Sequence, residues 1–261
     1  MTALGRNRLV SAATALLLGS GAPALASDTS GRVVRYRVAD AANGALLYTI
    51  AGWTEPESGG GGRVAVASKF DFADGTSYRE RAVFADGTPP RCLSWTWSIA
   101  DGDATVVAAG STGVSDEAFP FLRGPLPRDV YPLHPSYALL GYALTHLGLG
   151  QRHEATFHYT LMDTALLEME LRIGSRETVV VPAGRYDAHR VRMRPTVRSL
   201  YPSLPASARP LVSFFVPSST FWVTTAEPQT LVKMSGTIGP PGSPNVVVEL
   251  VADGVEPRDR E

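Results

Sequence analysis

The stretch from residue 93 to residue 99 alternates large apolar and small polar residues without a break. Successive side chains of a β-strand point to opposite faces, so one face of this stretch would carry an apolar stripe of Leu93, Trp95, Trp97 and Ile99. The same two-residue period returns along most of the chain. A chain patterned in this way is predicted to form an antiparallel sheet with one strongly apolar face.

Residues 1–26 have the pattern of a secretory signal peptide. Arg6 and Arg8 supply the positive start, residues 9–18 supply an apolar run, and small residues at the end of the segment supply a cleavage site. The apolar run is short and is followed by glycine and proline, which argues against a retained membrane anchor. We therefore expect an exported, periplasmic protein that is not transmembrane.

The rest of the chain is long enough to bury a sizeable core. We expect a single β-rich domain over residues 27–255 and a disordered tail over residues 256–261. The charge balance beyond residue 26 is slightly acidic, which argues against nucleic acid as a partner. Cys92 is the only cysteine, so the chain has neither an internal disulfide nor a metal site built on a cysteine pair.

Asp-Gly dipeptides separate the alternating runs in the first half of the chain. They occur at Asp74, Asp86 and Asp101. Glycine accepts the positive φ of a tight turn, so each dipeptide predicts a hairpin between neighbouring strands. The strands predicted along the whole chain are 33–38, 45–53, 64–72, 78–84, 92–99, 155–161, 167–173, 186–193, 220–225, 230–236 and 245–251.

Two segments depart from the strand pattern. Residues 136–147 carry helix formers that are apolar nearly all round, which predicts a helix buried against the open face of the sheet. Residues 200–216 combine three prolines with leucine, valine and phenylalanine, which predicts an apolar loop or short helix over the sheet's edge. The predicted fold is mainly β: a strongly curved antiparallel sheet, between a half-barrel and an open barrel, with one apolar helix across its concave face.

Three further motifs accompany the export signal, the Asp-Gly hairpins and the central helix. They are Val-Pro-Ala-Gly-Arg-Tyr-Asp at residues 181–187, Phe-Trp-Val-Thr at residues 221–224, and Pro228 before Leu-Val-Lys-Met at residues 231–234. Together these features resemble the bacterial DUF3108 family of exported proteins, over most of the chain beyond residue 26. The resemblance implies an antiparallel half-barrel similar to the envelope lipoprotein carriers. It brings no catalytic residues, because the family has no such motif.

The chain lacks the common signatures of catalysis and metal binding. Neither a G-x-S-x-G nor an H-E-x-x-H pattern occurs beyond residue 26. Cys92 is better interpreted as a small core residue than as a nucleophile, which would need a nearby histidine. Asp187 and His189 are predicted to share the inward face of a strand. They would hold a ligand head group there, although a histidine satisfied by its neighbours is the favoured interpretation. We expect no catalytic residue, metal or cofactor.

Aromatic side chains are the main candidates for function. They would build the core, and sheet curvature would also leave an apolar cleft beside the central helix. We expect an exported, non-enzymatic protein that binds or carries an acyl chain or lipid. The alternative is an envelope interaction module that docks a protein partner through a sheet edge or residues 200–216. An unrecognised hydrolase is the least favoured hypothesis. The predicted ligand-binding residues are Phe70, Trp95, Trp97, Tyr137, Leu140, Leu144, Tyr159, Asp187 and His189.

Overall fold

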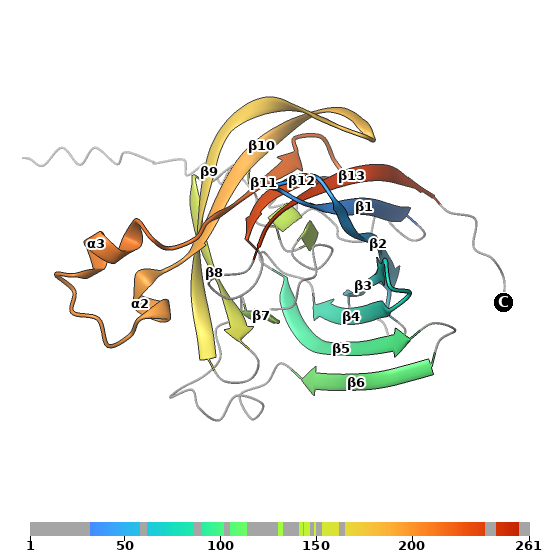
Figure 1. The fold of residues 1–261 in the computed structure, drawn as a ribbon, viewed down its shortest axis with the longest axis horizontal. Coiled ribbons are helices and arrows are strands. Elements are labelled where there is room, and N and C mark those ends of the chain that lie inside the picture. Colours follow the sequence, from blue (N-terminus) through green and yellow to red (C-terminus); the bar gives the residue numbers. More distant parts are fainter. Residues whose placement is uncertain are drawn as a thin grey trace, which may run out of the picture.

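The computed structural model describes residues 32–57, 62–85, 90–101, 105–113, 130–132, 141–142, 144–146, 149, 153–161, 165–237 and 244–255. These residues are mainly β (Figure 1). The strands are β1 (Arg32–Asp40), β2 (Leu46–Pro56), β3 (Arg63–Phe72), β4 (Ser77–Ala85), β5 (Arg91–Asp101), β6 (Thr105–Gly113), β7 (Val130–Pro132), β8 (Glu154–Leu161), β9 (Ala165–Val181), β10 (Gly184–Pro195), β11 (Ser219–Thr224), β12 (Leu231–Thr237) and β13 (Asn245–Val255). Two short helices, α2 (Val197–Leu200) and α3 (Arg209–Ser213), lie between β10 and β11.

All thirteen strands belong to one sheet, in the order β6-β5-β4-β3-β2-β1-β13-β12-β11-β10-β9-β8-β7. It consists of two antiparallel meanders, β1–β6 and β8–β13, which the pairing of β1 with β13 joins. Strand β7 is added to the end of the second meander, parallel to β8. The prediction of a mainly β, antiparallel fold is confirmed. The predicted strong curl into a half-barrel is wrong for the described residues, because the sheet is open between β6 and β7 and is not strongly curled.

The turn between β3 and β4 has the predicted Asp-Gly chemistry. Gly75 adopts a φ of +89°, and the N–H of Thr76 donates to Oδ1 of Asp74 at 2.8 Å. The N–H of Phe72 donates across the turn to the carbonyl of Thr76 at 3.0 Å. The other two Asp-Gly turns lie outside the described residues or at their border, although the strands that flank them pair as predicted.

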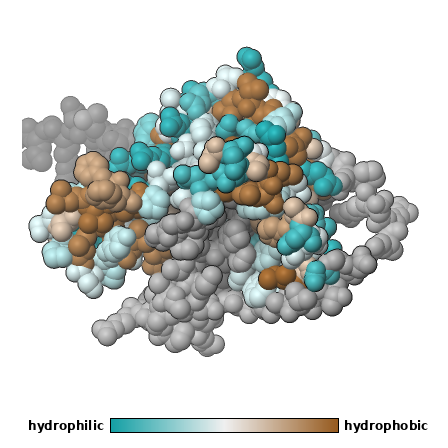
Figure 2. Space-filling view, viewed as in Figure 1, coloured by the Kyte–Doolittle hydropathy of each residue, from teal (hydrophilic) through white to brown (hydrophobic). Residues whose placement is uncertain are grey.

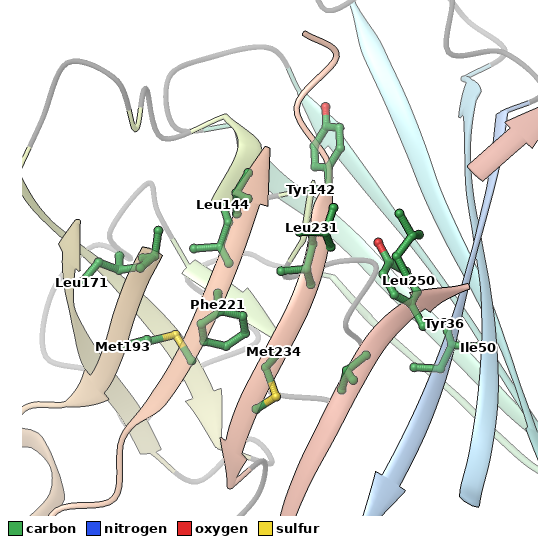
Figure 3. Packing of buried hydrophobic residues seen from close by; sticks show 14 of the residues in the cluster. Tyr36, Ile50, Tyr142, Leu144, Leu171, Met193, Phe221, Leu231, Met234 and Leu250 are labelled. Carbon is green, nitrogen blue, oxygen red and sulfur yellow. The ribbon is translucent and has the colours of Figure 1, made fainter. Parts of the chain in front are cut away.

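The core follows rows of directly paired residues across the sheet. One row crosses eight strands from β3 to β9, and its members from Val38 to Ile173 are buried. Because directly opposed residues of an antiparallel pair share a face, a single register keeps the row on the interior side. Figure 3 shows Phe221, Met193 and Met234 in this interior. The row is Phe72, Tyr48, Val38, Val248, Met234, Phe221, Val191 and Ile173.

A helical segment lies against the interior face of the sheet. Gly141, Tyr142, Leu144 and Thr145 are helical, while the greater part of the predicted helix over residues 136–147 lies outside the described residues. A Cβ on Gly141 would lie 3.4 Å from Cβ of Leu231 in β12, and the ring of Tyr142 lies 4.9 Å from that of Phe84 in β4. Strands β4 and β12 are five places apart in the sheet. The sheet therefore bends enough for one segment to contact both.

Gly236 in β12 is a position where only glycine fits. Its φ is +141°, and an added Cβ would lie 2.7 Å from Cα of Ser219 in β11. Because the obstacle includes the backbone of a paired strand, it cannot rotate away. We expect Gly236→Ala to lower the free energy of unfolding by about 3 kcal/mol, measured by urea denaturation.

Gly44→Ala is the matched control for this substitution. Gly44 also has a positive φ, +72°, but no atom lies within 4 Å of its added Cβ. The free energy of unfolding of Gly44→Ala should fall by only about 1–2 kcal/mol, which is the cost of backbone strain without a steric clash. Equal losses for the two variants would contradict a packing role for Gly236.

Candidate functional site

An open pocket of about 490 Å³ lies where β3 and β5 end and β2 and β4 begin, beside the β3–β4 turn. We call it the aromatic pocket. Its wall comes from four neighbouring strands and is almost wholly apolar. The two polar residues that line it, Asp74 and Thr76, belong to the turn at the rim. The wall is made of Tyr48 from β2, Phe70 and Phe72 from β3, Tyr78 from β4 and Ile99 from β5.

Strand register brings these wall residues together. Phe70 is paired directly with Tyr78, and Tyr78 with Ile99, so the three share one face of the sheet. Phe72 is paired with Tyr48 in the next row on the same face. Cross-strand neighbours of this kind stabilise a sheet through side-chain contact. Two adjacent rows of the register therefore form the pocket wall.

The aromatic rings of the pocket contact one another in sequence. The centroids of Tyr48 and Phe72 are 5.0 Å apart, and those of Phe70 and Tyr78 are 5.3 Å apart in an edge-to-face arrangement. Tyr78 is stacked on Trp97 at 6.4 Å. These separations lie in the range over which aromatic pairs attract each other. The wall is thus held in shape by its own rings, and Trp97 extends the series into β5.

A buried carboxylate lies next to the aromatic pocket on the same face. Glu80 is only 3% exposed and is paired directly with Ser68, whose hydroxyl donates to Glu80 Oε1. Burial, together with the nearby Glu80 carboxylate, raises the pKa of Tyr78 above its usual value, so the phenol stays neutral. At the rim, the backbone N–H of Thr76 lowers the pKa of Asp74 and keeps that carboxyl ionised. The pocket therefore has a neutral wall and a negative rim.

The structure places only part of the predicted ligand-binding set at this pocket. Phe70 lines it, and Trp97 and Trp95 continue its aromatic series, with their rings 6.5 Å apart. Leu144 is fully buried in the hydrophobic core (Figure 3) and is not one of the residues that line the pocket. Tyr137 and Leu140 lie outside the described residues. The backbone of Tyr159 in β8 pairs with Leu167 in β9, and the side chain of Tyr159 is not among those described.

Asp187 and His189, which were predicted to share an inward face, differ in burial. Asp187 is exposed and accepts a hydrogen bond from the Thr178 hydroxyl at 2.9 Å, whereas His189 is buried. Residues 188–193 of β10 pair with β11 without a register shift, so His189 lies on the buried face with Val191 and Met193, whereas Asp187 precedes these paired residues and is exposed. Burial, and the positive charge of Arg176, lower the pKa of His189. His189 is therefore a neutral side chain packed into the sheet, which agrees with the interpretation of it as a core residue rather than a ligand-binding one.

Sequence reasoning missed Tyr48, Phe72, Tyr78 and Ile99 as site residues. One signal was present for Tyr78, because the Asp-Gly turn fixes the register of β3 on β4. Phe70 and Tyr78 lie at equal distances on either side of Asp74, so a hairpin centred there opposes them. Nothing local in the sequence marks Tyr48, because its place beside Phe72 depends on the long turn between β2 and β3.

Among the described residues no group of three His, Cys, Asp or Glu side chains is arranged to hold a metal ion. In the same part of the chain, no helix has the length and apolar character needed to cross a membrane.

Comparison with known proteins gives only distant structural likeness. No family model and no curated protein matches the chain, so membership of DUF3108 is not confirmed. The chain is similar to a β-barrel-like protein of domain of unknown function DUF1849 from Brucella abortus, with 8% identity, a TM-score of 0.45, and coverage of 87% of this chain and 98% of that one. It is also similar to a lipoprotein candidate from Parabacteroides distasonis, with 13% identity, a TM-score of 0.39, and coverage of 86% and 95%.

A third similar structure is a candidate exported protein with a YmcC-like fold from Bacteroides fragilis. It shares 13% identity at a TM-score of 0.38, with coverage of 87% of this chain and 96% of that one. Likeness at this level establishes neither common ancestry nor a shared activity.

Cys92 provides a test of the packing at the other end of β4 and β5 from the pocket. It is fully buried opposite Phe84, and burial raises the pKa of its thiol to about 12. Because only the thiolate reacts, we expect a disulfide reagent at pH 8 to label the folded protein at least about a hundredfold more slowly than the urea-unfolded chain. Cys92 is the only cysteine, so the signal has one source. Comparable rates in the two states would show that this part of the sheet opens readily.

Proposed function

We propose that this protein binds a hydrophobic molecule in the aromatic pocket and carries it without changing it chemically. The observation that supports this most directly is the pocket itself: about 490 Å³, open to solvent, with five apolar or aromatic side chains as its wall. Small-molecule sites have this form, with a mostly apolar lining and a few polar groups that orient the ligand. Each square ångström of apolar surface removed from water would contribute about 25 cal/mol to binding.

The charge at the rim narrows the class of ligand. The ionised Asp74 carboxylate lies where the polar end of a bound molecule would emerge. A like charge there is disfavoured, so a free fatty acid would fit less well than a neutral ester, an alcohol or an amine. The proposed ligand is therefore a molecule with one acyl or aromatic body and an uncharged or cationic end.

Export to the periplasm is part of the same proposal. The signal-peptide pattern of residues 1–26 supports it. The bend that lets residues 141–142 contact both β4 and β12 supports the idea that the helix over residues 136–147 lies across the concave face of the sheet. An exported carrier of this kind would shield an apolar molecule from water between two membranes or proteins.

Phe72→Glu tests the pocket directly. Phe72 is 36% exposed, so the substitution should leave the fold intact while placing a charge in the apolar wall. We expect the affinity for the neutral fluorescent probe N-phenyl-1-naphthylamine to fall at least about tenfold. Phe215→Glu is the matched control, since Phe215 is 85% exposed and lies outside the pocket wall. Unchanged probe affinity in a folded Phe72→Glu variant would rule out this site.

Asp74→Asn tests the proposed choice of head group. The asparagine oxygen can still accept the hydrogen bond from Thr76 N–H, so the turn is kept while the charge is removed. We expect the affinity for a fatty acid anion to rise about threefold and that for its neutral methyl ester to stay constant. Competition against the naphthylamine probe measures both. A parallel change for the acid and the ester would show that the rim charge does not select the ligand.

A further inference from the structure

The segment between β10 and β11 stands out from the body of the sheet, at the left of Figure 1, rather than lying over its edge as predicted. Its root is fixed: the N–H of Thr196 donates to the carbonyl of Glu168 at 2.8 Å, and Val216 is buried. Between these points the chain forms α2, a run of turns, and α3. We call residues 196–218 the α2–α3 protrusion.

The tip of the α2–α3 protrusion is strongly apolar and unusually exposed. Leu211 is 70% exposed, Phe214 84% and Phe215 85%, which makes the two phenylalanines the most exposed large hydrophobic side chains among the described residues. Figure 2 shows hydrophobic side chains gathered on this projection, where Figure 1 places α2 and α3. Adjacent side chains of this size are costly to leave in water, so their exposure marks an interaction site.

The base of the protrusion is positively charged. A groove of about 300 Å³ between it and the ends of β9 and β10 is lined by Arg194, Arg198 and Arg209, with Glu170 as its one acidic residue. Glu170 is paired with Arg194 at 3.1 Å, which leaves two arginines in excess. Nε of Arg209 also donates to the carbonyl of Leu204 at 3.2 Å, and this hydrogen bond within the protrusion fixes the position of the Arg209 guanidinium. Residues 196–218 contain no Asp or Glu.

We propose that the α2–α3 protrusion binds the surface of a bilayer that contains anionic lipid. Leu211, Phe214 and Phe215 insert among the acyl chains, and Arg198 and Arg209 contact the headgroup phosphates. An apolar layer next to a cationic layer is the arrangement of side chains that a membrane interface selects. Arginine is well suited to phosphate because its planar group donates two parallel hydrogen bonds.

The shape and charge favour lipid over the protein partner that the sequence suggested for residues 200–216. The tip is a narrow convex projection on a five-residue helix, which can enter a fluid layer but offers little area for a stable protein interface. Both charges that α2 and α3 contribute to the groove are positive, matching a surface of uniform negative charge. This membrane contact does not depend on a ligand in the aromatic pocket.

Vesicle flotation with the full chain tests the inference. We expect the protein to float with vesicles of equal parts phosphatidylglycerol and phosphatidylcholine, and much less with phosphatidylcholine alone. The double variant Phe214→Ser/Phe215→Ser should lower the partition into anionic vesicles at least about tenfold. Arg198→Gln should lower it about fivefold, and added salt should act in the same direction.

Matched controls come from exposed residues elsewhere on the sheet. Leu46→Ser/Val180→Ser removes two exposed apolar side chains, and Arg185→Gln removes an exposed cation at another site. Neither should alter flotation, nor should Phe72→Glu, which separates this contact from the aromatic pocket. Failure of the wild-type protein to float, or equal flotation of the double variant, would overturn the inference. A third outcome would also overturn it: the wild-type protein self-associates in ultracentrifugation and does not bind vesicles, and the double variant abolishes the self-association. The tip would then contact a second copy of the chain.

Discussion

The pairing of β1 with β13 is the interaction on which the rest of the sheet depends. It joins the meander β1–β6 to the meander β8–β13, and it sets the register of one half against the other. The row from Phe72 to Ile173 stays on one face only because this pairing places Val38 opposite Val248. A slip of one residue there would turn every buried side chain of one meander towards solvent. A long-range contact between the two ends of the chain therefore fixes the core.

The aromatic pocket is the unfilled end of that core. Along the row the side chains are buried from Ile173 to Val38, and then become partly exposed at Tyr48 and Phe72, where β2 begins and β3 ends. The large rings at this end contact one another across neighbouring strands: the centroid of Tyr48 lies 5.9 Å from that of Phe70 and 5.0 Å from that of Phe72. The pocket thus needs no special loop, because it follows from ending a row with aromatic residues instead of aliphatic ones.

The sequence predicted local features well and long-range ones poorly. Alternation and Asp-Gly turns located β1–β5, β8 and β10–β13 to within about four residues, because strand period and turn chemistry are local. The prediction ended β9 at residue 173 instead of Val181, and it missed β6 and β7. The alternation of β10 did not show that Asp187 is exposed while His189 is buried, because β11 pairs with β10 only from Ala188 onward. A bulge near Phe84 places Cys92, rather than Leu93, opposite that ring, and one extra residue of this kind cannot be seen in the period. Trp97 was predicted as a site residue from the apolar stripe of residues 93–99, and Phe70 from the alternation of residues 64–72. Tyr48 becomes a neighbour of the site only through pairing between strands.

The two apolar surfaces of the chain differ in form, and the difference separates their roles. The aromatic pocket is concave, neutral along its wall and negative at its rim, which suits one small molecule with an uncharged end. The tip at Phe214 and Phe215 is convex and adjoins arginines, which suits an extended anionic surface. They belong to different meanders of one sheet, so either can be altered without changing the register that builds the other. A carrier resting on a bilayer through the second surface would meet apolar molecules where they are most concentrated, and the first could then bind them without a long search through water.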